Sequence, residues 1–244
     1  MRLFGLIGYP LAQSFSKKYF TAKFEKEGIK NCRYELFQIG NIDELPGILK
    51  TYPELEGLNV TIPYKQLVLK YLNTSDNLPV GLKACNCIKI DKGLLKGYNT
   101  DIPGFEKSFT PLLKNHHTKA LILGNGGATA AVKYVLEKLN IDYSIVSRKL
   151  HDGSSLTYHD LDEKQISEHL VIINTTPLGS FPAVDNCPDI PYQFLTGKHY
   201  LFDVVYNPAK SLFLQKGEGR GAAIKNGYDW LVIQAEESWR IWNE

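Results

Sequence analysis

The sequence has 244 residues with a formal net charge of +2, and 43% of them are hydrophobic. This is the composition of an ordinary globular protein, long enough for one large domain or two modest ones with cores of their own. The near-neutral charge excludes the strongly basic surface that nucleic acid or an anionic membrane attracts, and no apolar run approaches the roughly twenty residues that span a bilayer, so we expect a cytoplasmic protein.

The N-terminal part of the chain alternates strand-like and helix-like segments. Strands are predicted over residues 2–8, 33–39 and 57–62, and helices over 16–27 and 42–51. Asn41 is the expected N-cap of the second helix, and Asp91-Lys92-Gly93 suits a hairpin turn between strands 85–90 and 94–96. The alternation predicts a mixed, mainly parallel sheet with an antiparallel edge.

A second α/β series begins near Thr118. Its strands are predicted over 119–123, 143–147, 170–174, 200–204 and 222–224, and a helix over 229–242 follows them. The glycine-rich stretch 217–221 is predicted to be a flexible turn. We therefore predict an α/β protein of two domains, with residues 1–101 and 227–244 forming one and residues 102–226 the other.

The most informative motif is Gly124-Asn125-Gly126-Gly127-Ala128, which stands between a predicted strand and a predicted helix. That context distinguishes a dinucleotide site from a chance cluster of glycines. Glycines let the backbone approach a pyrophosphate closely, and the helix N-terminus offers it unpaired N–H groups. The second domain is therefore predicted to be a Rossmann-type domain that binds NAD or NADP.

The end of the next strand, Ser147-Arg148-Lys149, indicates which dinucleotide is bound. About twenty residues past the glycine turn, NAD sites usually carry an acid for the ribose 2′-OH, whereas this chain has two cations. A guanidinium suits a 2′-phosphate through paired, charge-assisted hydrogen bonds. A solvated basic strand end is the alternative, but after a nucleotide turn we favour NADP.

Polar residues of the first domain gather at predicted strand ends, where α/β proteins bind ligands. They are Ser14, Ser16, Asn59, Thr61, Lys65, Asn86, Asn99, Thr100 and Asp101. This set suits a small polyhydroxylated or carboxylate ligand. Ordinary alternatives exist for single members: Ser16 and Asp101 as helix caps, and Lys65 as a surface lysine.

The four cysteines, Cys32, Cys85, Cys87 and Cys187, do not form a recognisable disulfide framework. No histidine cluster accompanies them, so we predict reduced thiols and no metal site.

Eight short motifs resemble those of shikimate dehydrogenases, in family order across nearly the whole chain. They are SFS at 14–16, NVTIPYK at 59–65, ACN at 84–86, GYNTDIPG at 97–104, GNGGA at 124–128, NTTPLG at 174–179, DVVYNP at 203–208 and LVIQA at 231–235. The resemblance implies an NADP-dependent oxidoreductase that reduces 3-dehydroshikimate to shikimate, in the pathway through chorismate to aromatic amino acids.

The resemblance also implies roles for individual residues. Ser14 and Ser16 hold the substrate carboxylate; Thr61, Asn86 and Gln234 hold ring hydroxyls, with Asn59 and Tyr206 nearby; Lys65 and Asp101 form the catalytic pair. Residues 124–128 and 147–149 bind NADPH together with Thr175 and Val205, and Gly227 borders the nicotinamide. Lys65 is expected to contribute most to turnover, with Asp101 sharing substrate binding.

The chain departs from the family pattern at a few positions. Gln13 stands where histidine is usual, Lys17 where proline is common, Ser147 and Lys149 where asparagine and threonine flank the arginine, and Asp229-Trp230 where the family has Gly-Met. Since that methionine is expected near the nicotinamide, Trp230 is predicted to reshape the pocket and Asp229 to repel the cofactor phosphates.

Two other functions stay open at this point. One is a quinate/shikimate dehydrogenase that uses NAD, and the other is a non-catalytic sensor that binds NADPH and a shikimate-like ligand. In each case we expect small-molecule ligands, no nucleic acid or membrane partner, and a monomer or homodimer.

Overall fold

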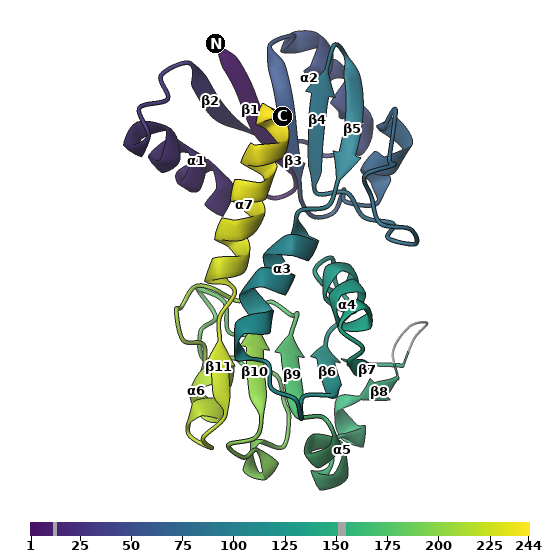
Figure 1. The fold of residues 1–244 in the computed structure, drawn as a ribbon, viewed down its shortest axis with the longest axis vertical. Helices are drawn as coiled ribbons and strands as arrows, with labels where there is room; N and C mark the ends of the chain where they lie inside the picture. Colours follow the sequence, from purple (N-terminus) through teal and green to yellow (C-terminus); the bar gives the residue numbers. More distant parts are fainter. Residues whose placement is uncertain (12–13, 151–154) are drawn as a thin grey trace. The chain divides into compact units, whose positions relative to one another are not determined.

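The computed structural model describes residues 1–11, 14–150 and 155–244, which form two compact units (Figure 1). Unit 1 comprises Met1–Pro103 and Leu231–Glu244, and unit 2 comprises Gly104–Trp230. Both boundaries fall inside helices, namely α3 (Asp101–Phe109) and α7 (Tyr228–Asn243). Within the described residues, no helix has the length and apolar character needed to cross a membrane.

The sheet of unit 1 is mixed and has the strand order β2-β1-β3-β4-β5. Its strands are β1 (Arg2–Gly8), β2 (Cys32–Gln38), β3 (Leu55–Val60), β4 (Cys87–Asp91) and β5 (Leu94–Tyr98). β1 pairs in parallel with β2 and β3, whereas β4 runs antiparallel to β3 and β5. The predicted mixed sheet with a hairpin at its edge is therefore confirmed.

Helices cover both faces of this sheet because side chains alternate along β1. Leu3 and Ile7 pack in one cluster with residues of η1 (Ile42–Glu44) and α2 (Leu45–Thr51). Phe4 and Leu6 pack in the opposite cluster with α1 (Phe15–Lys26) and with the part of α7 that belongs to unit 1. Burial of apolar side chains on both faces fixes the register of the strand.

Helix caps in unit 1 agree with the sequence at one position and differ at two. Asn41 caps η1, where its side chain accepts a hydrogen bond from the Asp43 N–H. α1 begins at Phe15, so Ser16 lies inside the helix and the N-cap alternative for it is wrong. Asp101 is likewise the first residue of α3, and the Asn99 side chain accepts the Ile102 N–H.

The sheet of unit 2 is parallel throughout and has the order β11-β10-β9-β6-β7-β8. Its strands are β6 (Lys119–Leu123), β7 (Asp142–Ser147), β8 (Leu156–Thr157), β9 (Val171–Asn174), β10 (Tyr200–Asp203) and β11 (Ala223–Lys225). Strand order reverses between β6 and β9, so the loops after these two strands flank the crevice in which such folds bind nucleotides. The predicted Rossmann-type domain is confirmed.

The helices of unit 2 are α4 (Thr129–Lys138), α5 (Glu163–Glu168) and α6 (Leu212–Glu218), with short 3-10 turns at η3 (Thr110–Leu112), η4 (Tyr158–Asp160) and η5 (Tyr192–Phe194). The prediction of a flexible turn over 217–221 is wrong at its start. Gly217 lies in α6, and a Cβ there would be 2.3 Å from Cδ2 of Leu201. Glycine is therefore needed for close packing of helix on strand.

Candidate active site

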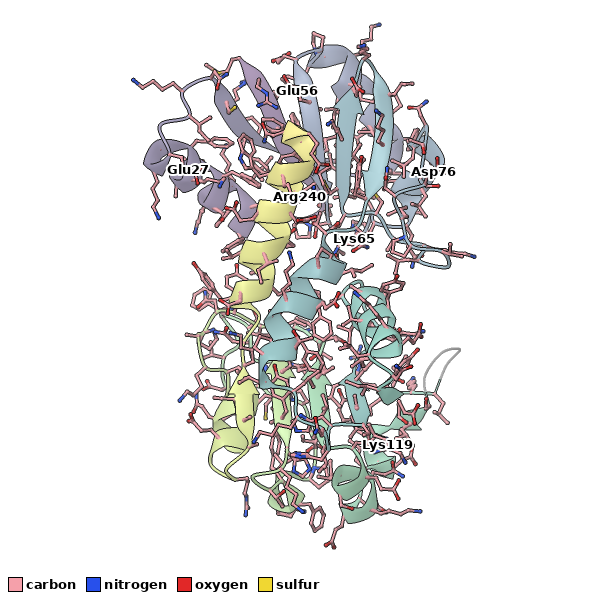
Figure 2. All side chains as sticks on the ribbon, viewed as in Figure 1. Glu27, Glu56, Lys65, Asp76, Lys119 and Arg240 are labelled. Carbon is pink, nitrogen blue, oxygen red and sulfur yellow. The ribbon has the colours of Figure 1, made fainter. Side chains whose placement is uncertain are left out.

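Lys65 and Asp101 form an ion pair in unit 1. The Lys65 Nζ lies 2.6 Å from Oδ2 of Asp101, and the two side chains are only 18% and 12% exposed. Figure 2 marks Lys65 beside the start of α3, where Asp101 is the first helical residue. A carboxylate this close fixes the direction of the ammonium, and the low exposure strengthens the interaction relative to a surface pair.

A buried hydrogen-bond network begins at the residue before Asp101. Thr100, next to Asp101, donates its N–H to Oδ1 of Asn86 (2.6 Å) and receives a hydrogen bond on its hydroxyl from Nδ2 of the same side chain (3.0 Å). The Thr100 and Ser238 hydroxyls are 3.2 Å apart, and Nδ2 of Asn59 donates to the Ser238 hydroxyl at 2.9 Å. The network thus joins β3, the residues before β4, and α7 within unit 1.

The predicted substrate residues of unit 1 connect to this network or lie at the same sheet edge. Ser16 is hydrogen-bonded to Tyr34, whose hydroxyl donates to Oδ1 of Asn59 at 2.8 Å. The backbone oxygen of Gln234 accepts the Ser238 hydroxyl at 2.9 Å. Thr61 follows β3, and its N–H donates to the Ile7 carbonyl of β1 at 3.0 Å.

Ser14 differs from its neighbours because its hydroxyl is buried without a hydrogen-bond partner among the described residues. A buried hydroxyl that lacks a partner costs free energy, which a bound acceptor would recover. Gln13, one of the departures from the family pattern, lies outside the described residues.

In unit 2, the glycine turn follows β6 directly and leads into α4. Gly124 has a φ of +101°, and a Cβ at this position would lie 2.7 Å from Cγ2 of Thr176. Both the dihedral and the close approach require glycine here. Gly127 and Ala128 complete the turn immediately before the first residue of α4, Thr129.

The turn forms one wall of a cavity of about 790 Å³ at the strand-order reversal of unit 2. Its lining includes seven predicted cofactor residues, Gly124, Asn125, Gly126, Ser147, Arg148, Lys149 and Thr175, together with Tyr158, Thr176, Pro177 and Leu178. The volume lies within the range of about 300–1,000 Å³ that small-molecule sites occupy. A glycine-turn backbone on one side and two exposed cations on the other fit the phosphates of NADP.

A buried carboxylate, Asp203, organises the loops beside this cavity. It accepts hydrogen bonds from Nδ2 of Asn174 (2.9 Å), from the Val205 N–H (3.0 Å) and from the Ser211 hydroxyl. Asn174 in turn accepts the Thr176 N–H at 3.0 Å. Asp203 therefore ties the loop after β9 to the loop after β10.

Val205 and Gly227, two further predicted cofactor residues, are hydrogen-bonded to each other, since the Gly227 N–H donates to the Val205 carbonyl at 3.2 Å. Tyr206, a predicted substrate neighbour, follows Val205 in unit 2, and burial raises the pKa of its hydroxyl.

Burial of Asp203 predicts a pH dependence of stability. Desolvation raises its pKa to about 6, against hydrogen bonds that lower it, whereas the unfolded value is about 3.9. Between these pH values the native state binds more protons at Asp203 than the unfolded state does. This group therefore lowers the free energy of unfolding by up to about 3 kcal/mol as the pH rises from 4 to 6. Above the upper pKa its contribution is constant.

The Asp203→Asn variant should lose that slope while keeping acceptors for Asn174 and Val205. The measurement is the free energy of urea unfolding at pH 4, 5, 6 and 7, compared between wild type and variant. Asp185→Asn, which removes an exposed carboxyl of the same unit, is the control. Equal slopes for wild type and Asp203→Asn would contradict the prediction.

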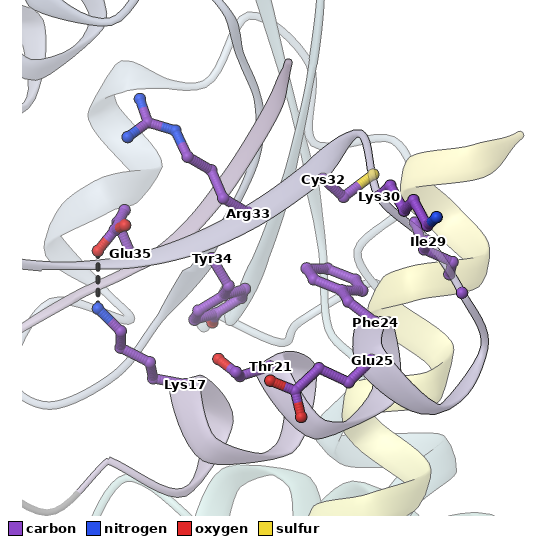
Figure 3. A pocket seen from close by; sticks show the side chains of 11 residues that line it. Lys17, Thr21, Phe24, Glu25, Ile29, Lys30, Cys32, Arg33, Tyr34 and Glu35 are labelled. Carbon is purple, nitrogen blue, oxygen red and sulfur yellow. Dashed lines mark hydrogen bonds and ion pairs between the residues drawn. The ribbon is translucent and has the colours of Figure 1, made fainter.

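A second hollow, of about 500 Å³, lies between α1 and β2 of unit 1 (Figure 3). Of the described residues that line it, none belongs to the predicted site. Lys17 and Glu35 on its wall neutralise each other through an ion pair of 2.8 Å. The predicted site residues of unit 1 therefore lie outside this hollow.

Comparison with known proteins identifies the family. Residues 6–88 match the family model of the shikimate dehydrogenase substrate binding domain. A shikimate dehydrogenase (NADP(+)) of Methanococcus maripaludis is 35% identical over 259 residues, which cover 99% of this chain and 91% of that protein. The chain belongs to the shikimate dehydrogenase family.

Solved structures agree with this assignment. Shikimate 5-dehydrogenase from Listeria monocytogenes, in complex with shikimate and NAD, superposes with a TM-score of 0.86 at 26% identity and covers 100% of this chain and 92% of its own. Shikimate 5-dehydrogenase from Thermus thermophilus, in complex with NADP(H) and shikimate, superposes with a TM-score of 0.83 at 26% identity. The match covers 99% of this chain and 93% of that one. The predicted family is confirmed.

The two residues that replace the family's Gly-Met have structural partners in unit 2. Trp230 is 6% exposed and packs against Phe105 and Phe202, with ring centroids 5.1 and 6.2 Å away. Asp229 forms an ion pair with Lys225, the last residue of β11, so its charge is compensated. Trp230 is thus a core residue of unit 2, and Asp229 is not an isolated negative charge.

Sequence reasoning missed three residues of these two sites. Tyr34 and Ser238 complete the network around Asn59, and Tyr158 lines the cavity of unit 2. The spacing of Ser238, four residues after Gln234 on one helix, was a usable signal, because positions i and i+4 share a helix face.

Proposed function

We propose that this chain is an NADP-dependent shikimate dehydrogenase that reversibly reduces 3-dehydroshikimate to shikimate, a step of aromatic amino acid biosynthesis. The observation that carries the proposal is the shielded Lys65–Asp101 pair, at 2.6 Å, within the motifs of this family. Unit 1 acts as the substrate domain and unit 2 as the cofactor domain.

NADPH, when bound, supplies a hydride to the carbonyl carbon of the substrate. The carbonyl oxygen gains negative charge as the hydride arrives, and the Lys65 ammonium stabilises this charge and has a proton to donate. The Asp101 carboxylate, 2.6 Å from the amine, keeps it oriented toward the reacting oxygen. In the reverse direction the same pair accepts the hydroxyl proton.

The other substrate residues hold the ring in place. The Ser14 hydroxyl, buried without a partner among the described residues, donates with Ser16 to the substrate carboxylate. Thr61, Asn86 and Gln234 hold the ring hydroxyls, and Tyr206 is a further residue assigned to the substrate. Asn59 acts through its neighbours, because its side chain is already hydrogen-bonded to Tyr34, to the Asn86 backbone and to Ser238.

The cofactor residues are those of the glycine turn, the cations after β7, Thr175, Val205 and Gly227. The turn backbone receives the pyrophosphate, and Arg148 and Lys149 receive the 2′-phosphate of the adenosine ribose. Among the described residues, no acid forms an ion pair with either cation, which favours NADP over NAD.

The test is the loss of NADPH absorbance when 3-dehydroshikimate is added, with NADH in a parallel cuvette. We expect fast oxidation of NADPH and slow oxidation of NADH. Tight NADPH binding without turnover would contradict the proposal and support a non-catalytic sensor.

A quinate/shikimate dehydrogenase that uses NAD is the second candidate within this family. Oxidation of quinate by NAD⁺ at a rate equal to oxidation of shikimate by NADP⁺ would favour it. In either case we expect small molecules as the only ligands and a cytoplasmic monomer or homodimer.

A further inference from the structure

Among the described residues that line the cavity of unit 2, Tyr158 alone is aromatic. It is the first residue of η4 and directly follows β8. The start of this turn is held by Asp160, because both the N–H and the hydroxyl of Thr157 donate to its Oδ2 at 2.7 Å. The backbone at Tyr158 is thereby fixed at the rim of the cavity.

The Tyr158 ring is held by packing as well. It lies partly buried against the core cluster of unit 2, which contains Leu161 and Ile166. A side chain anchored by its ring presents its hydroxyl at low cost in conformational entropy. Packing of the ring therefore restricts the positions that the hydroxyl group can occupy.

The Tyr158 hydroxyl lies within electrostatic reach of Arg148, which shares the same cavity wall. Burial and the negative charge of Asp189 raise the pKa of Tyr158, and the positive charge of Arg148 lowers it, so the phenol stays a neutral donor at pH 7. Within residues 1–11, 14–150 and 155–244, no hydrogen bond engages this hydroxyl and no ion pair engages Arg148.

We propose that Tyr158 determines cofactor specificity by donating a hydrogen bond from its hydroxyl to the 2′-phosphate of the adenosine ribose, beside Arg148. The inference rests on the proposed function only for the identity of the dinucleotide. A phosphate monoester has three acceptor oxygens and a charge of −1.5 to −2. A guanidinium occupies two of these oxygens as a fork. Each phosphate oxygen accepts more than one hydrogen bond, so a neutral donor still finds an acceptor beside Arg148 and Lys149.

The test compares Tyr158→Phe with wild type by titrating each protein with NADPH and with NADH and monitoring its fluorescence. The phenylalanine ring keeps the packing and removes only the hydroxyl. We expect the Kd of NADPH to rise about ten- to a hundredfold, as for loss of a hydrogen bond to a charged group, with the Kd of NADH unchanged. Adenosine 2′,5′-bisphosphate and AMP, as competitors, should show the same contrast.

Tyr192→Phe is the matched control. Tyr192 packs against the same core cluster, but its hydroxyl donates to the Pro188 carbonyl at 2.7 Å within the protein. This variant should leave the ratio of the NADPH and NADH dissociation constants at the wild-type value.

Titration separates this inference from the proposed function, because binding is measured without turnover. An unchanged Kd of NADPH in Tyr158→Phe, or an equal rise for NADH, overturns the inference while catalysis by the wild type stands. Selective loss of NADPH affinity supports the inference even where 3-dehydroshikimate is not reduced. Failure of the wild type to bind NADPH overturns both.

Discussion

Replacing Lys65 with alanine should lower kcat for 3-dehydroshikimate reduction about a thousandfold, within the range of about 10²–10⁴ that a positioned acid or base contributes. The ammonium acts on charge that develops only in the transition state, so kcat falls more than KM rises. Initial rates of NADPH oxidation at saturating substrate measure the effect. Asp101→Asn should raise KM as well, because Asp101 shares substrate binding.

Lys70→Ala is the matched control for this prediction. Lys70 and Asp43 form an ion pair of the same length, 2.6 Å, but their side chains are 56% and 58% exposed. Exposed pairs contribute little to stability, about 0–1 kcal/mol. This one joins η2 (Leu67–Tyr71) to η1 and has no part in the hydrogen-bond network of Asn59, Asn86, Thr100 and Ser238. If Lys65→Ala keeps the wild-type kcat, or if Lys70→Ala lowers kcat as much as Lys65→Ala does, the catalytic role proposed for Lys65 is wrong.

Local sequence patterns predicted the elements that are long or bounded by strong turn signals. β1 and β6 were predicted with the bounds that the structure has. Each is a mostly apolar run, and β6 ends at a glycine turn while β1 ends before a loop that contains Pro10. β8, with two residues, and α5, with six, were missed, since segments this short carry no measurable periodicity.

Contacts between residues far apart in the chain were not predictable in the same way. The Asn59–Ser238 hydrogen bond joins positions 179 residues apart, and no local pattern contains that separation. Trp230 was assigned to a pocket from a family position, whereas its aromatic neighbours Phe105 and Phe202 place it in the core of unit 2. Motif order located the site residues, but the identity of each hydrogen-bond partner required the fold.

Replacing Gly227 with alanine should lower the free energy of unfolding by about 3 kcal/mol or more, at the upper end of overpacking effects. An added Cβ would lie 2.3 Å from the carbonyl oxygen of Val204 and 2.7 Å from its carbonyl carbon. These are backbone atoms, so no rotamer change relieves the contact and the segment after β10 must shift. That shift also strains the hydrogen bond from the Gly227 N–H to Val205.

Urea denaturation of the cofactor-free protein, followed by tryptophan fluorescence, measures the loss. Gly126→Ala is the control in the same unit, because a Cβ there would meet no atom within 4 Å. We expect Gly126→Ala to unfold within about 0.5 kcal/mol of wild type, yet to bind NADPH more weakly, because its methyl group would stand where the turn backbone approaches the pyrophosphate. Gly227→Ala should instead lose stability before any ligand is added. A urea midpoint of Gly227→Ala equal to that of wild type would show that the segment after β10 moves without cost. It would also contradict the role of Gly227 in holding Val205 beside the cofactor.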